Sequence, residues 1–352
     1  RDLASLPSVV DLSAGLPPVG NQGMQSSCVA WALGYYYKTF QERQERGWEV
    51  NTTAHQFSPA YIYNQINGGK DEGAAIPDAL NLLVTQGCDT LDSFPYNEND
   101  WWTQPGLEHR ARAYHFRAHR WATIDEAFTD GFLDPRLIKA ALQYGPVVMG
   151  ALVYWEAGWA EGEISLADVA DYSTPDGGHA ICIVGYDDRY PTKDGSGAFK
   201  FINSWGTGWG YGGYGWVSYD YVNYLAFEAE QMWDLTTTLS LSRNAFELGV
   251  GKKQQVKAVA KYSDCKQEDV TRTAAWTSSD PSVAQVVGGL VTAVGAGRAT
   301  ITASYAFKEV SCTVTVPSLP PRNLKATTSS AGVRLTWQPP PGTRAPSRYD
   351  VY

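Results

Sequence analysis

The stretch NQGMQSSCVAW, residues 21–31, places a cysteine between a small-residue loop that contains glutamine and the beginning of an apolar segment. Apolar side chains predict a helix from Cys28 to Arg46, with Gly47 as its C-terminal cap. Cys28 then lies in the first turn, where the helix dipole favours the nucleophilic thiolate. Because free cysteines are among the most buried residues, Cys28 is either a nucleophile or a packed core thiol.

The composition is that of soluble globular domains, with 43% hydrophobic and 18% charged residues among 352, a length that predicts two or three domains. A net charge of -9 argues against a nucleic-acid partner. The densest basic run, residues 110–120, is interpreted as the solvated side of a connecting strand.

No apolar run reaches the roughly 18 residues of a membrane helix. No signal-peptide pattern is present, and the start at Arg1 leaves open whether a leader was removed.

The sequence pattern changes near residue 235. Residues 1–235 contain every histidine and nearly all of the tryptophan, so any chemistry is expected there. Residues 236–316 predict short alternating strands separated by Gly, Ser and Asp turns, the pattern of an all-β immunoglobulin-like sandwich. The linker PSLPPR leads into residues 317–352, which predict two strands and the start of a third. So short a segment cannot close a sandwich, and we expect the natural chain to continue past Tyr352.

Within residues 1–235, helix signals come first and strand signals second. Ser58-Pro59 and Asp134-Pro135 have the pattern of an N-cap followed by a first-turn proline, and residues 76–86 before Gly87 predict a further helix. The apolar runs VVMGALVY, HAICIVGY and KFINSW predict strands of a mostly buried sheet. The order indicates an α+β fold in which a helical lobe packs against a β lobe.

A cysteine nucleophile needs a base within hydrogen-bond reach and a third group that orients the base. His179 follows two glycines at the mouth of the strand HAICIVGY, where it can face a cleft or be a hydrogen-bonded core histidine. Asn203 lies one strand onward, where a hairpin would bring it beside His179, although a turn asparagine fits the same pattern. His115 and His119 have the i,i+4 spacing of metal ligands, but the segment alternates like a strand and lacks acidic partners, so no metal site is predicted.

Three motifs, NQGMQSSCVAWA, GGHAICIVGYD and FINSWGTGWGYGGYGWVSY, resemble the papain-like cysteine peptidase family and occur in that family's chain order. The resemblance implies a papain-like two-lobe fold, a helical lobe plus a β-barrel-like lobe, with no cofactor and no metal. It assigns the nucleophile to Cys28, the general base and later acid to His179, and the orienting side chain to Asn203. Gln22 would donate to the oxyanion beside the Cys28 backbone N–H, and Trp205 would cover the hydrogen bond between Asn203 and His179.

The resemblance also implies where substrate binds. The substrate-binding positions that it assigns are Gly73, Ala74, Gly150, Gly177, Gly178 and Trp205. Gly73-Ala74 stands where the family has a glycine pair that binds the substrate main chain. Small residues predict a roomy pocket for a large apolar or aromatic side chain at the second residue before the scissile bond. Alternatively, Glu228 closes the floor of this pocket and admits basic side chains.

Two positions near Cys28 depart from the family pattern. Gln25 stands where the family usually has a cysteine that forms a disulfide, so this bridge must be absent. Val29 replaces the bulky aromatic residue that commonly follows the nucleophile. Trp31, two residues further on, is expected to fill part of the vacated space.

The C-terminal third resembles two kinds of β module. VTAVGAGRATITASY and WTSSDPSVAQV resemble the bacterial immunoglobulin-like group 2 domain, and residues 317–352 are similar to the first strands of a fibronectin type III domain. Such modules imply an exported bacterial protein, secreted or at the cell surface, with contacts to a cell surface or extracellular matrix. Cys265 and Cys312 form either a disulfide within the immunoglobulin-like domain or two unpaired thiols.

Together these features predict a secreted cysteine endopeptidase that hydrolyses protein or peptide substrates through a thioester acyl-enzyme. One alternative is an exopeptidase or transpeptidase on the same scaffold. Another is a non-catalytic surface adhesin whose peptidase-like domain only binds, against which the complete set of Cys, His, Asn and Gln side chains argues.

Overall fold

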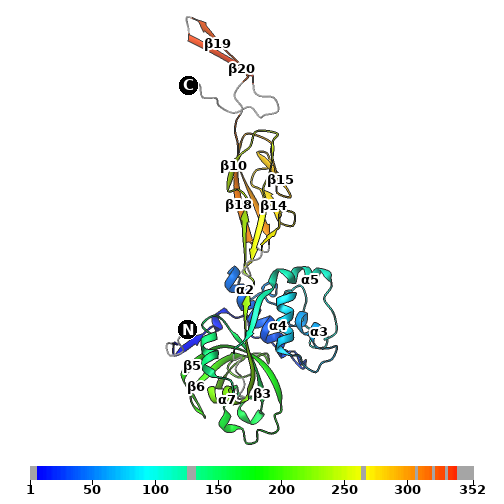
Figure 1. The fold of residues 1–352 in the computed structure, drawn as a ribbon, viewed down its shortest axis with the longest axis vertical. Helices are drawn as coiled ribbons and strands as arrows, with labels where there is room; N and C mark the ends of the chain where they lie inside the picture. Colours follow the sequence, from blue (N-terminus) through cyan, green and yellow to red (C-terminus); the bar gives the residue numbers. More distant parts are fainter. Residues whose placement is uncertain are drawn as a thin grey trace. The chain divides into compact units, whose positions relative to one another are not determined.

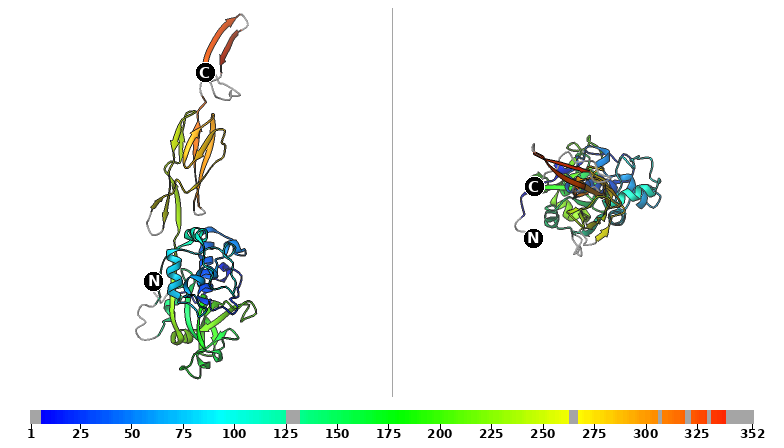
Figure 2. Two further views of the ribbon diagram at one scale, coloured as in Figure 1. Left: turned by 90° about the vertical axis from the view of Figure 1, so that its right-hand side faces the viewer. Right: turned by 90° about the horizontal axis from the view of Figure 1, so that it is seen from above.

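The computed structural model describes residues 6–124, 132–262, 267–305, 308–318, 322–329 and 332–338. The chain divides into two compact units, Arg1–Leu235 and Thr236–Tyr352. In the first unit the helices drawn in blue and cyan gather in one half and the strands drawn in green in the other (Figure 1, Figure 2). None of the helices within the described ranges is long and apolar enough to span a membrane.

The predicted helix over residues 28–46 is confirmed as three consecutive segments. They are α1 (Cys28–Ala30), the π-helical η3 (Trp31–Lys38) and α2 (Thr39–Arg46). Gly47 ends the helix in the left-handed conformation, with φ of 69°, and its N–H donates to the carbonyl of Arg43 at 2.8 Å. All eight residues of η3 are buried, as expected for a helix surrounded by the rest of the protein.

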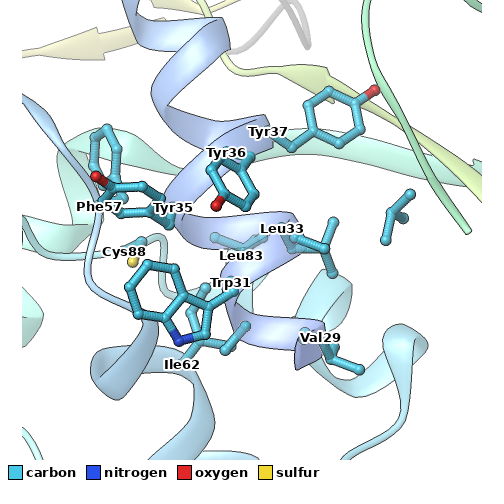
Figure 3. Close-up of a cluster of buried hydrophobic side chains, with 14 of the residues drawn as sticks. Val29, Trp31, Leu33, Tyr35, Tyr36, Tyr37, Phe57, Ile62, Leu83 and Cys88 are labelled. Atoms are coloured by element: carbon cyan, nitrogen blue, oxygen red, sulfur yellow. The ribbon is translucent and has the colours of Figure 1, made fainter. Parts of the chain in front are cut away.

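The helical half is built around this central helix. Figure 3 shows Trp31, Leu33 and the tyrosines of η3 packed among Phe57, Ile62, Leu83 and Cys88, all of them buried. The predicted caps are present: Ser58 Oγ accepts from the Tyr61 N–H at the start of α3 (Pro59–Ile66), and Asp134 caps α6 (Pro135–Ala141). The other helices of this unit are η2 (Ser13–Gly15), η4 (Thr53–His55), α4 (Ile76–Thr85), α5 (Leu107–Ala113), η5 (Tyr114–Phe116), η6 (Trp155–Ala157), η7 (Leu166–Asp168) and α7 (Tyr219–Leu225).

The other half is a mainly antiparallel sheet in the order β2-β8-β3-β5-β6-β7-β4, with β1 paired to β5. Its strands are β1 (Val9–Asp11), β2 (Ala118–Thr123), β3 (Val147–Val153), β4 (Glu163–Ile164), β5 (Gly177–Thr192), β6 (Gly195–Ile202), β7 (Tyr214–Ser218) and β8 (Ala226–Asp234). One face contributes Val148, Cys182 and Met232 to the core of the helical half. The opposite face packs on a second core with Ile138 of α6 and Val222 of α7. The helical lobe, the β lobe and the α+β class are therefore as predicted.

The interpretation of residues 110–120 as a connecting strand is wrong for its first half. Residues up to 113 belong to α5, η5 follows, and β2 begins only at Ala118. One basic side chain of the run, Arg112, bonds to the carboxylate of the buried Asp89, as does His109 just before the run. Because Asp89 accepts these bonds from one side of the segment, its carboxylate favours a helix here, although the sequence alternates as in a strand.

The second unit is all β. One sheet has the order β10 (Ala245–Glu247), β18 (Lys308–Val316), β17 (Gly297–Tyr305) and β14 (Ala275–Ser278). Two three-stranded sheets are formed by β11 (Lys253–Gln255), β16 (Leu290–Ala293) and β15 (Ala284–Val287), and by β13 (Gln267–Asp269), β12 (Ala258–Tyr262) and β9 (Thr237–Leu241). Buried Val256, Ile301 and Val314 form the centre of its core.

Beyond this core, β19 (Arg322–Ser329) and β20 (Gly332–Gln338) form a hairpin. The third strand expected near residue 350 lies outside the described residues, and the fibronectin-like module stays a prediction. Cys312 is a buried, unpaired thiol. Cys265, the other member of the pair for which a disulfide and two unpaired thiols were both considered, lies outside the described residues.

A buried group of charges joins the central helix to the end of β8. The Lys38 ammonium lies 2.6 Å from Glu42 Oε1 and 2.5 Å from Asp234 Oδ1, and its side chain is fully buried. Burial alone would lower the pKa of Lys38, but the charges of Asp234 and Glu42 outweigh it and raise the pKa. Lys38 is therefore charged and pairs with both carboxylates at the join between the helix and the sheet, and Arg46 also pairs with Glu42.

Replacement of Lys38 by methionine is expected to lower the free energy of unfolding by about 3–5 kcal/mol, because it removes the buried cation that lies between the carboxylates of Glu42 and Asp234. Chemical denaturation followed by tryptophan fluorescence measures this change. Lys193→Met is the matched control, since Lys193 pairs with Asp168 on the exposed surface and its loss should change stability far less. Equal effects of the two variants would contradict the structural role of Lys38.

Candidate active site

A cleft of about 610 Å³ lies between the helical half and the sheet of the first unit. Cys28 and Val29, at the start of the central helix, form one wall together with residues 72–76. His179 and its neighbours on β5, with Phe227 and Glu228 on β8, form the other. The cleft thus brings together the thiol and the imidazole that the sequence motifs single out.

Cys28 is a half-buried thiol at the N-terminus of the central helix. Burial would raise its pKa, but a hydrogen bond to His179, the charge of that imidazole and the backbone N–H groups of Ala180 and Val29 together lower the pKa below the ordinary thiol value. The first helical turn supplies N–H groups that point toward an anion in the same way. This site therefore favours the thiolate of Cys28.

His179 is held on its far side by Asn203. Its Nε2 lies 2.8 Å from Asn203 Oδ1 in a buried hydrogen bond, in which the imidazole N–H donates to the amide oxygen. This arrangement directs Nδ1 toward Cys28. The Ser204 N–H also donates to Asn203 Oδ1 at 2.8 Å, and the Asn203 N–H donates to the Gly213 carbonyl. These bonds fix the orientation of both the asparagine side chain and the imidazole ring.

Two tryptophans enclose the imidazole. Trp205 stacks on His179 with ring centroids 4.6 Å apart, and the fully buried Trp159 meets the same ring edge-on at 5.8 Å. The predicted position of Trp205 beside the pair of His179 and Asn203 is thus observed. Trp159 was not identified from the sequence, because nothing in its local pattern distinguishes it from an ordinary core tryptophan. Both rings exclude water from the imidazole–amide hydrogen bond, which strengthens it.

Gln22 is oriented by hydrogen bonds of its backbone and its side chain. Its backbone N–H donates to the Ser204 carbonyl at 2.8 Å, and its Oε1 accepts from the Ser204 hydroxyl at 2.5 Å. Its Nε2 donates to the Gln25 carbonyl at 2.8 Å. The second N–H of this amide has no acceptor in the part of the chain that the structure describes. Ser204, which sequence reasoning missed, thus fixes which end of the Gln22 amide carries the free donor.

Gln25, which stands where relatives have a disulfide-forming cysteine, connects the loop before Cys28 to neighbouring residues by hydrogen bonds. Gln25 is buried, and its Nε2 lies 3.3 to 3.4 Å from the carbonyls of Asn97, Glu98 and Asp100. The Ser26 N–H donates to Asp71 Oδ1 at 2.9 Å. Several hydrogen bonds, to backbone carbonyls and to the Asp71 carboxylate, thus hold the loop against residues 71 and 97–100 without a covalent link.

Of the substrate positions implied by the resemblance, Gly73, Ala74 and Gly178 line the cleft, whereas Gly150, Gly177 and Trp205 do not. Gly177 is exposed at the first position of β5. A Cβ atom on Gly150 would lie 2.5 Å from the Phe227 ring, so the space above this glycine is already filled. The expectation of an open pocket lined by Gly150 is therefore wrong.

A β-bulge on β8 explains this difference. Gly150 pairs with Glu228, but the next residue, Ala151, pairs with Ala226, so Phe227 is an extra residue on β8. Such a bulge turns two consecutive side chains toward the same side, and both Phe227 and Glu228 line the cleft. The sequence carries no signal for the bulge, because alternation alone would send these two side chains to opposite faces.

The chain belongs to the papain family of cysteine proteases, whose family pattern matches residues 6–233. It is therefore a papain-like peptidase, a hydrolase. Residues 235–314 match the bacterial Ig-like domain (group 2).

Similar proteins agree with this assignment. An uncharacterized peptidase C1-like protein of Acanthamoeba polyphaga mimivirus is 28% identical over 232 residues, which are 62% of this chain and 69% of that protein. A cysteine protease of Blomia tropicalis is 27% identical over 225 residues, 60% of this chain and 61% of the relative. Among solved structures, xylellain, a cysteine protease from Xylella fastidiosa, has 25% identity and a TM-score of 0.56, covering 66% of this chain and 88% of its own.

The rate at which iodoacetamide alkylates Cys28 is expected to rise with pH, because only the thiolate reacts. The midpoint of this rise should lie below the ordinary thiol pKa. His179→Ala removes the hydrogen bond and the charge that lower this pKa and leaves the burial that raises it. The midpoint of the rate–pH curve should therefore move to higher pH, with the rate at pH 7 falling by about tenfold or more, since one pKa unit is a factor of ten.

Peptide mapping by mass spectrometry identifies the labelled cysteine. The control is His55→Ala, because His55 lies on η4 and bonds to the Glu49 carbonyl outside the cleft. A midpoint that is the same in the wild type and in His179→Ala would show that the imidazole does not act on this thiol.

Proposed function

We propose that this protein is a cysteine endopeptidase in which Cys28 is the nucleophile, His179 the general base and acid, and Asn203 the residue that orients His179. The single observation that carries the proposal is the imidazole held between the two partners, with its Nε2 bonded to Asn203 at 2.8 Å and its other edge toward a thiol whose pKa is lowered. This is the arrangement that an activated thiol nucleophile requires.

In the first half-reaction the Cys28 sulfur forms a bond to the scissile carbonyl carbon, and the carbonyl π electrons move to oxygen. The oxyanion accepts hydrogen bonds from the free N–H of the Gln22 side chain and from the Cys28 backbone N–H. His179 holds the proton that left the thiol and delivers it to the nitrogen of the departing amine. The C–N bond then breaks and leaves a thioester on Cys28.

In the second half-reaction a water molecule attacks the thioester carbonyl and His179 accepts its proton. The tetrahedral oxyanion forms again at the same donors and collapses to a carboxylic acid, and the C–S bond electrons return to Cys28 as thiolate. Asn203 keeps the imidazole in one orientation through both proton transfers. Trp205 and Trp159 keep solvent from that bond throughout the cycle.

The cleft supports a preference for a basic side chain at the second residue before the scissile bond. Phe227 offers an apolar ring to the aliphatic stem of arginine or lysine, and Glu228 offers a carboxylate to its cationic end. Burial raises the pKa of Glu228, so its charge is present only above a pH that exceeds the usual range of glutamate. When Glu228 is protonated, the pocket carries no charge from this side chain and the alternative preference, for apolar or aromatic side chains, is expected.

We further propose that the protein is exported by a bacterium and acts outside the cell or at its surface. The immunoglobulin-like group 2 domain supports this, because such modules serve as spacers or adhesion domains and carry no chemistry of their own. The fibronectin-like similarity of residues 317–352 supports the same placement.

The test of the proposed function is the hydrolysis of an internally quenched peptide that is blocked at both termini. The wild type should cleave it, and Cys28→Ser should not. Gln22→Ala should lower kcat by about 100- to 1000-fold, because one oxyanion donor is lost. Gln44→Ala on the exposed face of α2 is the control and should leave the rate unchanged.

A peptide epoxide that reacts with thiols locates the nucleophile in the same preparations. The adduct is expected on Cys28 and should disappear in His179→Ala. Cleavage only of peptides with a free terminus would identify an exopeptidase instead. Absence of both cleavage and labelling would contradict the proposal and favour a protein that binds without catalysis.

A further inference from the structure

One carboxylate oxygen joins the loop before Cys28 to helix α3. Asp71 Oδ1 accepts the Ser26 backbone N–H at 2.9 Å and the Tyr63 hydroxyl at 2.6 Å. The main-chain carbonyl of Asp71 also accepts from the Ser26 hydroxyl at 3.3 Å. Because Ser26 is two residues before Cys28, Asp71 holds this loop at two points close to the nucleophile. Neither Asp71 nor Tyr63 takes part in the proton transfers of the catalytic cycle proposed above.

The Tyr63 hydroxyl extends this link to the wall of the cleft. Tyr63 lies on α3, is fully buried, and accepts the Gly73 backbone N–H at 3.3 Å. A tyrosine hydroxyl has a single proton, which Tyr63 donates to Asp71, so its oxygen is left to accept from Gly73. Gly73 and Ala74 line the cleft on the same side as Cys28. A chain of hydrogen bonds thus runs from the cleft wall through Tyr63 and Asp71 to the nucleophile loop.

Tyr63 keeps its proton while Cys28 titrates. Burial raises the pKa of Tyr63, and the bond to Asp71 and the charge of Cys28 add to this effect and outweigh the bond from Gly73. The pKa of Cys28, in contrast, is lowered. The direction of the two hydrogen bonds at Tyr63 is therefore the same whether Cys28 is a thiol or a thiolate.

The backbone of Gly73 depends on such an anchor. Its φ is 98°, in a region that glycine adopts without strain and other residues avoid. Because glycine has more conformational freedom to lose than other residues, a bond to its N–H restricts a segment that is otherwise permissive. The bond to Tyr63 therefore orients the main chain that leads into Ala74.

The other hydrogen bonds of the nucleophile loop lead elsewhere. Met24, Gln25 and Ser27 are bonded to residues 96–100. The bonds of Ser26 lead instead, through Asp71, to the segment at Gly73-Ala74. Asp71 thus connects the two parts of the cleft that must meet around a substrate.

We propose that Asp71 and Tyr63 are positioning residues, which hold the loop before Cys28 and the substrate-binding segment at Gly73-Ala74 in fixed register. This role rests on the peptidase function proposed above. The nucleophile and the oxyanion donors lie on the loop, whereas the main chain of the substrate binds at Gly73-Ala74. Attack requires the sulfur and the scissile carbon to approach to about 3–3.5 Å, so a shift between these two segments slows the reaction.

The first test removes only the branch that leads to Gly73. Tyr63→Phe keeps the ring and the bond from Ser26 to Asp71 but frees the Gly73 N–H. KM for a blocked peptide should rise about three- to tenfold, the contribution of one uncharged hydrogen bond, with kcat within about twofold of the wild type. Tyr186→Phe is the matched control, since Tyr186 is also fully buried and donates to the Pro7 carbonyl at 2.6 Å outside the cleft. It should change neither constant.

The second test removes the shared acceptor. Asp71→Ala should lower kcat/KM by about 100-fold, with losses in both kcat and KM, because the loop and the cleft segment are released together. Asp71→Asn keeps an oxygen that can accept both bonds, and kcat/KM should return to within about threefold of the wild type. Asp194→Ala is the control, because Asp194 accepts the Leu166 and Ala167 N–H groups at 2.7 Å outside the cleft and should not affect turnover.

Labelling of Cys28 gives a readout that needs no cleavage. A peptide epoxide reaches Gly73-Ala74, whereas iodoacetamide is too small to do so. In Tyr63→Phe the rate of epoxide labelling should fall about three- to tenfold relative to the rate of iodoacetamide labelling, and in Tyr186→Phe this ratio should not change. A defect that only loosens the fold would change both rates together.

Two results would overturn the proposal. One is a Tyr63→Phe variant whose KM and labelling ratio equal those of Tyr186→Phe. The other is an Asp71→Asn variant as slow as Asp71→Ala, which would show that the negative charge matters and the hydrogen bonds do not. If Asp71→Ala does not fold, Tyr63→Phe and Asp71→Asn still decide. If the wild type cleaves no peptide, the proposed function fails, whereas the labelling ratios still test the link from Asp71 to Gly73.

Discussion

The hydrogen bond between His179 and Asn203 is the contact on which the site depends. It connects the beginning of β5 to the end of β6, and the hairpin register of these strands determines that the two side chains meet. The central helix supplies the third member, because its first turn begins at Cys28 and faces the same edge of the sheet. The chemistry thus follows from a helix N-terminus placed against the end of a β-hairpin.

The same sheet determines the chemical character of the cleft. A bulge on β8 turns Phe227 and Glu228 toward substrate, and Gly150 leaves the space that the phenyl ring occupies. Two residues further along β8, Glu230 is buried and its Oε2 has no hydrogen-bond partner among the described residues, whereas Lys38 pairs with Asp234 at the end of the strand and with Glu42 on the central helix. Along β8, therefore, the acid at the end of the strand is paired with a lysine, whereas within the described residues no cation pairs with the buried acid near the cleft.

Much of this arrangement could be predicted from local sequence. Caps at Ser58, Gly47 and Asp134 mark helix ends because their backbone chemistry is local. The three motifs around Cys28, His179 and Asn203 could be assigned in the same way, since each includes several neighbouring residues of definite type.

What could not be predicted depends on pairing between distant strands or loops. The bulge at Phe227, the edge-on contact of Trp159 and the bond from Ser204 to Gln22 all require knowledge of register. Residues 110–113, the end of a helix, were assigned to a strand because the partner of this helix, Asp89, is about twenty residues away in the sequence.

The most direct test of the central claim is a double-mutant cycle between Asn203 and Trp205, read as kcat/KM for a single peptide substrate. If Trp205 acts by shielding the bond between His179 and Asn203, then Trp205→Ala and Asn203→Ala should each lower kcat/KM. The double variant should be no slower than Asn203→Ala alone, because no bond is left to shield. Additive losses in the double variant would show that the tryptophan acts independently, and would contradict the account of the site as a single hydrogen bond kept from water.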